Sequence, residues 1–359
     1  MADGSVQHLE TRTERGLTYP AFDIPAPGEA VEVAPGVLWL RLHLPMALDH
    51  VNIYALRDGA GWVLIDTGLF SDQTVEVYQK ILDGPLEGRP ITRVICTHMH
   101  PDHVGMAGWV CERFDAPLLM SRLEYVWTRV LVSDESAPAP RVGEILYRSA
   151  GYTEAQIEAW RAASGSFARS VSPIPLGYQR LKEDQVLSIN GDDWQVVIGE
   201  GHSPEHVCLW RKSDGVFIAG DQILPRISSN ISIWVTEPGA DPLGDWLRSL
   251  ERLRDLLPSD LFVLPAHGEP FYGVTTRLEA LLRGHQVALT RLERTLKNPS
   301  RAVDVFGALF ARPVGEAVLT LATGEALAHL NYLERQGRIG RERDARGVDW
   351  WTTLTEDSE

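Results

Sequence analysis

The run of residues 97–103 (THMHPDH) constrains this chain more than any other segment, because it carries four potential metal ligands. It stands where an apolar strand pattern gives way to a helical pattern. Side chains alternate in direction along an extended segment, so His98 and His100 can face the same cation. The turn into the helix redirects Asp102 and His103, and this geometry suits two neighbouring cations better than one.

Three further segments place metal-ligand residue types just beyond apolar strand patterns, at residues 201–206 (GHSPEH), 220–221 (GD) and 265–268 (PAHG). With the first run they contain six of the eleven histidines. A lone histidine is usually an ordinary hydrogen-bonded core residue, but this ordered set favours a metal site. Ser203 lacks a GxSxG setting, and no GK[ST] follows the glycine-rich turns, so neither a serine hydrolase nor a P-loop is indicated.

The predicted strands and helices alternate, which indicates an α/β fold with the motif residues at strand ends. Strands are predicted at residues 37–42, 51–56, 62–65, 91–97, 194–198, 206–210, 216–219 and 261–264. Helices are predicted among them at residues 72–82, 104–114 and 243–257.

The first 36 residues are predicted to form an N-terminal arm, because Pro20, Pro25, Pro27 and Pro35 oppose continuous helix or strand. The main domain is then expected to cover residues 37–274.

Two helical segments depart from the alternation. Residues from about 121 to 178 read as an insertion that shapes a pocket, and Thr153 is predicted to cap a helix over residues 154–163. Residues 275–359 are predicted to form a small appended helical domain, whose helix over residues 325–334 ends before Gly337.

Composition limits the class of protein. The chain has 359 residues, 44% of them hydrophobic, and a formal net charge of −15, which repels nucleic acid and anionic lipid. Three cysteines in no CxxC pair indicate reduced thiols, and neither a signal peptide nor a stretch of about 20 apolar residues is present. We therefore expect a cytoplasmic enzyme that acts on a small-molecule substrate, with no membrane partner.

The ordered motifs IDTG (residues 65–68), THMHPDH, GHSPEH, GD and PAHG resemble those of the metallo-β-lactamase superfamily, glyoxalase II included. The resemblance covers roughly residues 37 to 270. It implies an αββα sandwich, here classed as α/β (α+β), with the metal ions at one edge between two sheets. The C-terminal segment is similar to the winged-helix-like appendage of many members.

The resemblance also implies a role for each motif residue. His98, His100 and His202 would bind one metal ion, Asp102, His103 and His267 a second, and Asp221 would bridge both. Asp66 would orient a ligand histidine, and His206 would support the site in a similar way. Glu205 departs from the glycine that many glyoxalase II-like members have at its position.

Imidazole and carboxylate ligands without thiolate suit two Zn²⁺ ions, with Fe or Mn as alternatives. We expect a bridging hydroxide to attack an ester, thioester, lactone or amide-like bond, with Asp102 also helping to move a proton to the leaving group.

Three alternatives stay open. One is an endoribonuclease-type phosphodiesterase, supported only by residues 275–346, which carry twelve basic and eight acidic side chains. The same basic face could instead be plain solvated surface or a homodimer contact. The others are a diiron protein and a non-catalytic member of the fold, and metal analysis separates them from a zinc hydrolase.

Four more histidines, His8, His43, His285 and His329, lack ligand partners at suitable spacing and are interpreted as structural. His50 could touch substrate from the rim of the site, but a surface turn is the simpler interpretation.

Overall fold

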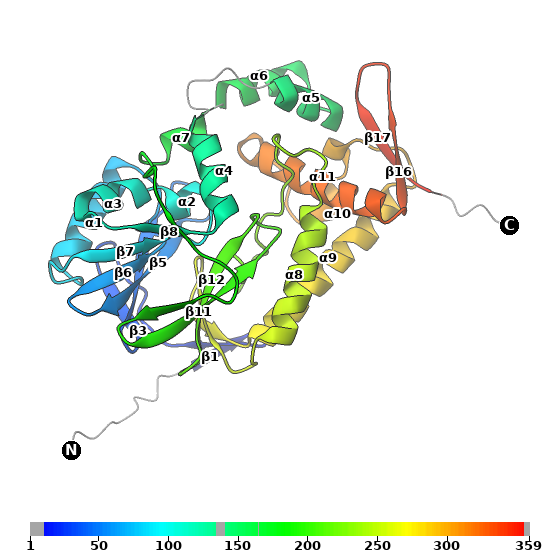
Figure 1. The fold of residues 1–359 in the computed structure, drawn as a ribbon. Coiled ribbons are helices and arrows are strands. Elements are labelled where there is room, and N and C mark those ends of the chain that lie inside the picture. The colour runs from blue at the N-terminus through cyan, green and yellow to red at the C-terminus, as the bar shows by residue number, and fades with distance from the viewer. Residues whose placement is uncertain (1–10, 134–140, 164, 355–359) are drawn as a thin grey trace.

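The computed structural model describes residues 11–133, 141–163 and 165–354. Two β-sheets lie face to face, and helices cover the outer face of each (Figure 1). Apolar side chains from both sheets, among them Trp39 and Trp194, fill the space between them. The layers therefore run αββα, and the predicted fold class is confirmed.

One sheet has seven strands in chain order. They are β3 (Ala30–Ala34), β4 (Val37–His43), β5 (His50–Asp58), β6 (Gly61–Ile65), β7 (Ile91–Ile95), β8 (Leu118–Met120) and β9 (Gln179–Arg180). Its outer face is covered by α1 (Asp72–Asp83) and α3 (Ala107–Phe114). The side chain of Ser71 accepts a hydrogen bond from the Thr74 amide and so fixes the start of α1.

The other sheet has eight strands, ordered β1-β2-β15-β14-β13-β12-β11-β10. They are β1 (Thr11–Glu14), β2 (Leu17–Pro20), β10 (Val186–Ile189), β11 (Asp192–Gly199), β12 (His206–Arg211), β13 (Val216–Gly220), β14 (Phe262–Pro265) and β15 (Phe271–Tyr272). The helices α8 (Pro242–Leu256) and α9 (Val274–Thr295) cover its outer face. Figure 1 shows them on the flank opposite α1 and α3.

Parallel pairs occur in both sheets, between β6 and β7 and between β13 and β14. The carboxyl ends of parallel strands lie at one edge of a sheet, so the loops that follow these strands gather there. Asp66, His98, Asp221 and His267 follow β6, β7, β13 and β14, and this topology brings them together. His202 reaches the same edge from the loop between the antiparallel strands β11 and β12.

The prediction that residues 1–36 contain no continuous strand is wrong for the part of this arm that the structure describes. Arg15 and Gly16 both have positive φ, 53° and 77°, and form a two-residue turn between β1 and β2. Such primed turns match the twist of a hairpin. Pro20 ends β2, and Pro35 lies between β3 and β4, so the prolines separate strands rather than prevent them. Residues 1–10 of the arm lie outside the described residues.

The predicted helix over residues 104–114 is two helices, α2 (Pro101–Val104) and α3. The amide of Met106 donates to the carbonyl of Gly68 and to the hydroxyl of Thr67 instead of continuing α2. The start of α3 is thereby tied to the loop after β6.

The predicted helical insertion fills the connection between β8 and β9 with α4 (Arg122–Ser133), α5 (Arg141–Ala150), α6 (Glu154–Ala163) and α7 (Ser166–Arg169). Thr153 caps α6 as predicted, because its hydroxyl accepts a hydrogen bond from the Gln156 amide. Residues 134–140 and 164 of the insertion lie outside the described residues.

The C-terminal segment is helical as predicted. It contains η1 (Ala302–Asp304), α10 (Phe306–Leu309), η2 (Glu316–Val318), α11 (Leu319–Arg335) and a hairpin of β16 (Ile339–Arg343) and β17 (Asp349–Thr353). The hairpin was not predicted, and the winged-helix likeness stays a prediction. Residues 355–359 lie outside the described residues.

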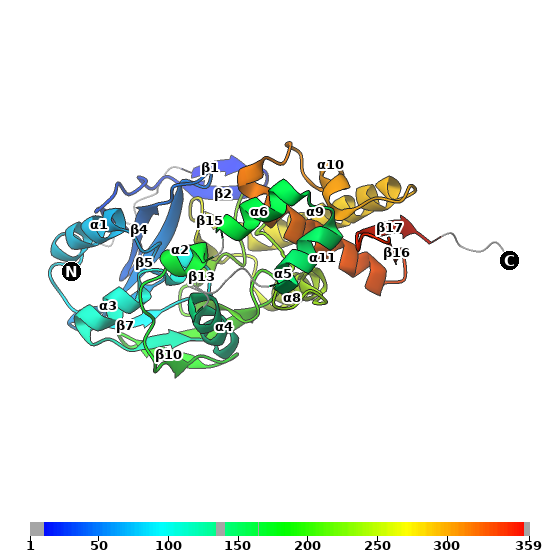
Figure 2. The same cartoon turned by 90° about the horizontal axis from the view of Figure 1, so that it is seen from above.

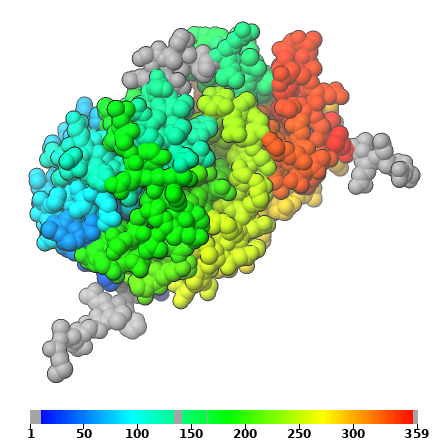
Figure 3. All heavy atoms as spheres, in the orientation of Figure 1, coloured from blue at the N-terminus to red at the C-terminus, as the bar shows by residue number. Residues whose placement is uncertain are grey.

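The insertion packs on the C-terminal segment. Tyr152, between α5 and α6, places its hydroxyl 3.1 Å from that of Thr323 on α11. Seen from above, α5 and α6 lie across α11 (Figure 2), and the space-filling view shows the green insertion beside the red hairpin (Figure 3). None of the described helices has the length and apolar character needed to cross a bilayer.

Candidate metal centre

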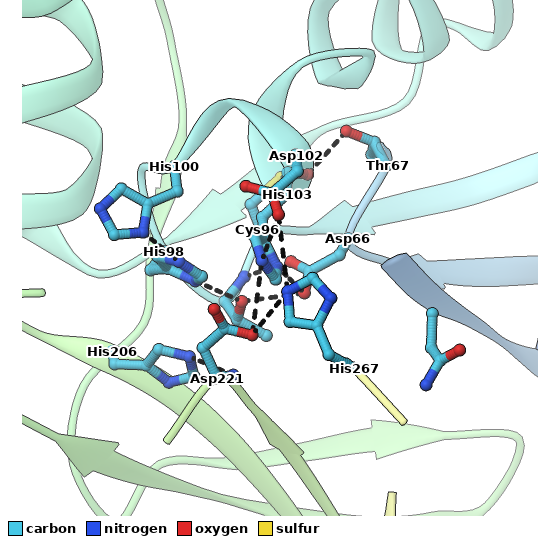
Figure 4. Close-up of polar contacts among 12 residues, drawn as sticks. Asp66, Thr67, Cys96, His98, His100, Asp102, His103, His206, Asp221 and His267 are labelled. Atoms are coloured by element: carbon cyan, nitrogen blue, oxygen red, sulfur yellow. Dashed lines mark hydrogen bonds and ion pairs between the residues drawn. The ribbon is translucent and has the colours of Figure 1, made fainter. Parts of the chain in front are cut away.

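The predicted ligands lie together where the loops from the two sheets meet, and Figure 4 labels all of them except His202. His98 and His100 follow β7, Asp102 and His103 belong to α2, His202 lies between β11 and β12, and Asp221 and His267 follow β13 and β14. Residues that are up to 169 positions apart in the chain, His98 and His267, thus reach one cluster.

The first group of donor atoms is made of three imidazoles. Nε2 of His98, Nδ1 of His100 and Nε2 of His202 lie 2.9, 3.0 and 3.2 Å from one another. A tetrahedral zinc ion with Zn–N bonds of about 2.0–2.1 Å requires nitrogens spaced by little more than this. The three nitrogens therefore fit three corners of such a site.

The second group combines two imidazoles and a carboxylate. Oδ2 of Asp102 lies 3.6 Å from Nε2 of His103 and 3.5 Å from Nε2 of His267. Asp221 stands between the groups, with Oδ1 3.3 Å from His267 Nε2 and Oδ2 3.3 Å from His202 Nε2. One carboxylate thus faces both groups.

Hydrogen bonds outside the cluster fix how the histidine rings are protonated. Nδ1–H of His202 donates to the carbonyl of Asn230 (2.8 Å), and that of His267 donates to the carbonyl of His50 (2.7 Å). Nδ1–H of His103 donates to Oδ2 of Asp66 (2.8 Å). Each ring therefore directs its Nε2 into the cluster, and in the neutral tautomer with Nδ1–H this nitrogen is free to bind a metal ion.

The backbone of Asp66 lies in the left-handed region, at φ 59°, and its carboxylate contacts residues that border the cluster. Oδ1 accepts from the amide of Thr97 (2.7 Å), and Oδ2 accepts from the Thr97 hydroxyl (2.9 Å). The same hydroxyl lies 2.9 Å from Nδ1 of His98. Asp66 therefore orients His103 directly and His98 through Thr97.

His206, a predicted supporting residue, acts on the backbone of a ligand. Its Nε2 accepts a hydrogen bond from the amide of Asp221 (3.0 Å), and burial lowers the pKa of its ring to about 3. Gly220 has φ 51°, and a β-carbon there would lie 2.5 Å from the His206 ring. Glycine is thus required before Asp221, and His206 is a positioning residue.

The pKa values of the histidines show how charge is balanced in the cluster. Burial, with the neighbouring histidines, lowers the pKa values of His98 and His100 well below the ordinary range. Burial also opposes charge on His103, but the carboxylates of Asp102, Asp221 and Asp66 outweigh it and raise the pKa of that ring to about 10. Positive charge is therefore favoured here despite the burial.

Two buried polar atoms test the fit of a metal ion. Nε2 of His103 and Oδ1 of Asp221 have no hydrogen-bond partner among the described residues. Buried polar atoms are normally paired, and leaving one unpaired costs about 1–3 kcal/mol. Nitrogen and oxygen lone pairs that face one another in this way suit a divalent cation.

One supporting residue was missed from the sequence. Glu124 on α4 is fully buried, and its carboxylate accepts from the amides of Met99 (2.9 Å) and Glu205 (2.8 Å). It thus joins the loop of His98 and His100 to the loop of His202. Burial raises the pKa of Glu124 to about 7. No local pattern marked this glutamate, because its partners are backbone amides distant in the chain.

Glu205 and His50 stabilise loops that carry predicted ligands. The carboxylate of Glu205 accepts from the amide of Leu123 (2.9 Å), so it holds the start of α4 against the His202 loop. The ring of His50 accepts from the amide of Gly268 (2.9 Å) and braces the loop of His267. His50 begins β5, so the interpretation as a surface turn is wrong, and its contact with substrate stays a prediction.

The αββα sandwich and the cluster at its edge define a metal-dependent hydrolase. The chain belongs to the metallo-beta-lactamase superfamily, whose profile matches residues 46–267. A second profile, the metallo-beta-lactamase-like C-terminal domain, matches residues 289–354.

Relatives and solved structures agree with this assignment. The chain is 27% identical to the "Probable metallo-hydrolase YqjP" of Bacillus subtilis (strain 168), over 84% of this chain and 93% of that protein. A crystal structure of a beta-lactamase domain protein from Burkholderia ambifaria is 38% identical, with a TM-score of 0.86, over 94% of this chain and 98% of the other. The metallo-beta-lactamase family protein TTHA1429 from Thermus thermophilus is 28% identical, with a TM-score of 0.74, over 90% of this chain and 100% of the other.

Proposed function

We propose that the protein is a dinuclear zinc hydrolase that cleaves an ester, thioester, lactone or amide-like bond of a small molecule. The observation that carries the proposal is the position of Asp221, whose two carboxylate oxygens face two separate groups of donor atoms. A carboxylate that faces both groups is the arrangement expected for two adjacent ions.

His98, His100 and His202 would hold one ion, Asp102, His103 and His267 the other, and Asp221 would bridge them. The set contains only imidazole nitrogen and carboxylate oxygen, which suits zinc. Bound zinc ions would lower the pKa of water towards neutrality and polarise the substrate carbonyl.

The residues of the chain supply orientation and a proton route. Asp66, Asn230 and the His50 carbonyl hold the Nδ1–H of three rings and so keep each Nε2 turned inward. Asp102 is the most exposed carboxylate of the cluster, with 19% of its side chain accessible against 9% for Asp221. Its free oxygen can therefore hold the proton that passes to the leaving group.

A small-molecule substrate is favoured over nucleic acid by the charge of the chain. The net charge of −15 repels polyanions. Trp127 of the insertion lines the pocket that borders His202, and Glu325 of the C-terminal segment accepts a hydrogen bond from Asn230, whose carbonyl contacts His202.

The test is metal analysis followed by assays of the zinc-loaded protein. We expect about two zinc ions per chain and turnover of at least one carboxylic ester, thioester, lactone or β-lactam in a panel. Two iron ions would point to redox chemistry, and no metal to a binding role. Hydrolysis of bis(p-nitrophenyl) phosphate alone would replace the proposal by a phosphodiesterase.

A further inference from the structure

A pocket of about 160 Å³ borders the candidate metal centre on the side of His202. Met99 and His202 form part of its wall. The ring of Trp234, also in the wall, stacks on His100 with ring centroids 5.9 Å apart. A substrate whose carbonyl lies at the centre can therefore extend into this space, which we call the tryptophan pocket.

Two tryptophans dominate the apolar wall of the pocket. Trp127 comes from α4, and Trp234 comes from the segment between β13 and α8. Their ring centroids lie 6.2 Å apart at an interplanar angle of 65°, and both side chains are half-buried. Half-exposed indole faces attract cations through the ring quadrupole.

The charged residues in the wall are all acidic. Glu200, Glu237 and Asp245 line the pocket, and no lysine or arginine does so within the described residues. Asp245 pairs with Arg248, whereas Glu200 and Glu237 take part in no ion pair across the described ranges. Arg248 and Arg252 also act electrostatically on Glu200. The carboxylate of Glu237, which has no ion pair within the described residues, is therefore the negative charge that remains unbalanced beside the indole rings.

The pocket also contains a buried hydroxyl without a partner. Ser203 is 4% exposed, and its Oγ forms no hydrogen bond within the part of the chain that the structure describes. It lies near enough to Glu124 to lower the pKa of that carboxyl. The Ser203 hydroxyl can therefore donate to the Glu124 carboxylate or to an oxygen atom of a substrate in the pocket.

The cavity that borders His267, on the other side of the centre, contains arginine side chains. It measures about 230 Å³, and its wall includes Arg41, Arg226, His50 and His267. Glu269 also lies in this wall, 3.5 Å from Arg226, so the cavity carries charges of both signs. The tryptophan pocket, in contrast, combines carboxylates with indole faces.

We propose that the tryptophan pocket binds a compact cationic group of the substrate, an ammonium or quaternary ammonium, and so selects cationic esters and thioesters. The chemistry of this inference rests on the proposed hydrolase function, whereas binding of the cation does not. The small volume suits one head group rather than a whole drug-sized ligand of the kind that fills about 300–1,000 Å³.

The kinetic test compares two thioesters of equal shape. Acetylthiocholine carries a quaternary nitrogen where 3,3-dimethylbutyl thioacetate carries carbon. We expect kcat/KM of the zinc-loaded protein to be about tenfold higher for the cation, from cation–π and carboxylate contacts together. Glu237→Gln should lower this ratio by about threefold and Trp127→Leu by more, because each change removes a contact with the cation.

The matched control is Glu112→Gln, which removes an exposed carboxylate on α3 outside the pocket. It should leave the ratio unchanged. Equal kcat/KM for the two thioesters, or a preference for an anionic thioester, overturns the inference.

A binding measurement separates this inference from the proposed function. Calorimetric titration should show that choline binds more tightly than 3,3-dimethylbutan-1-ol, and that Glu237→Gln weakens only choline. Choline binding without hydrolysis of any ester would remove the proposed function and keep the pocket. Equal hydrolysis of the charged and uncharged thioesters, together with equal binding of the two alcohols, would keep the proposed hydrolase function and remove the cation-binding role of the pocket.

Discussion

The part of the chain that the structure describes contains two clusters of buried histidines, and the two differ in what their ring nitrogens contact. In the candidate metal centre, Nε2 of His103 has no hydrogen-bond partner among the described residues. In the second cluster, His285 on α9 and His329 on α11 have a partner for every nitrogen. Trp246 Nε1 donates to His285 Nε2 (3.0 Å), His285 Nδ1 faces His329 Nε2 (3.4 Å), and His329 Nδ1 donates to the carbonyl of Glu325 (2.8 Å).

Burial alone therefore does not make a histidine a ligand. Burial lowers the pKa of His285 to about 3 and of His329 to about 4, and no carboxylate raises them again. In the candidate metal centre, carboxylates raise the pKa of His103 to about 10 against the effect of burial. A metal site is marked by converging lone pairs together with negative charge.

The largest expected difference between the clusters is catalytic. His100→Ala should lower kcat/KM by at least about 10³-fold, because a lost ligand removes several kcal/mol of charge stabilisation. His329→Gln should keep most of the activity. Assays with the best panel substrate and metal content by mass spectrometry check both variants. Full activity of His100→Ala would discredit the candidate site.

The second prediction concerns acid stability, which the His285–His329 pair should control. A histidine in the unfolded chain has a pKa near 6.5. Between about pH 6.5 and pH 4, the unfolded chain therefore binds protons at these two rings, whereas the folded chain does not. The stabilisation is full above about pH 6.5 and is lost as the pH falls towards 4, by roughly 3 kcal/mol for each ring.

Urea unfolding at pH 7 and pH 5 measures this effect. The double variant His285→Gln/His329→Gln should be less stable than the wild type at pH 7 and closer to it at pH 5. If the difference in unfolding free energy between the wild type and the double variant were the same at both pH values, the pair would not resist protonation.

The third prediction tests orientation of a ligand from outside the cluster. Asp66→Asn should weaken zinc binding by about 10–100-fold, because the amide cannot fix Nδ1–H of His103 in the same way. Competition with a chromogenic chelator measures the affinity. Asp72→Asn, an exposed change at the start of α1, is the control. Equal affinity for Asp66→Asn and the wild type would contradict the assigned role.

The smallest effect is expected in the second cluster. Trp246→Phe removes the donor to His285 Nε2 and should lower the free energy of unfolding by about 1–3 kcal/mol. Zinc content and kcat/KM should stay unchanged. A loss of zinc in this variant would show that the two clusters are coupled.

Several strands escaped prediction although local signals marked them. Asn190 and Gly191 have φ values of 53° and 86° and form the turn between β10 and β11, yet β10 was not predicted. An Asn-Gly pair is a strong hairpin signal. The strands β1 and β2 were missed because the prolines near them were interpreted as breaks within an arm. Short strands at sheet edges depend on pairing partners that local patterns do not contain.

The motifs by themselves determined which residue types stand at the strand ends, and with them the family and the candidate ligands. Those features are local, since each follows from a few neighbouring residues and the strand before them. Only the tertiary structure decided which ring nitrogen faces the centre, that Glu124 joins two ligand loops, and that His285 and His329 are fully paired. These outcomes depend on contacts between segments far apart in the chain, and packing of the whole fold sets such contacts.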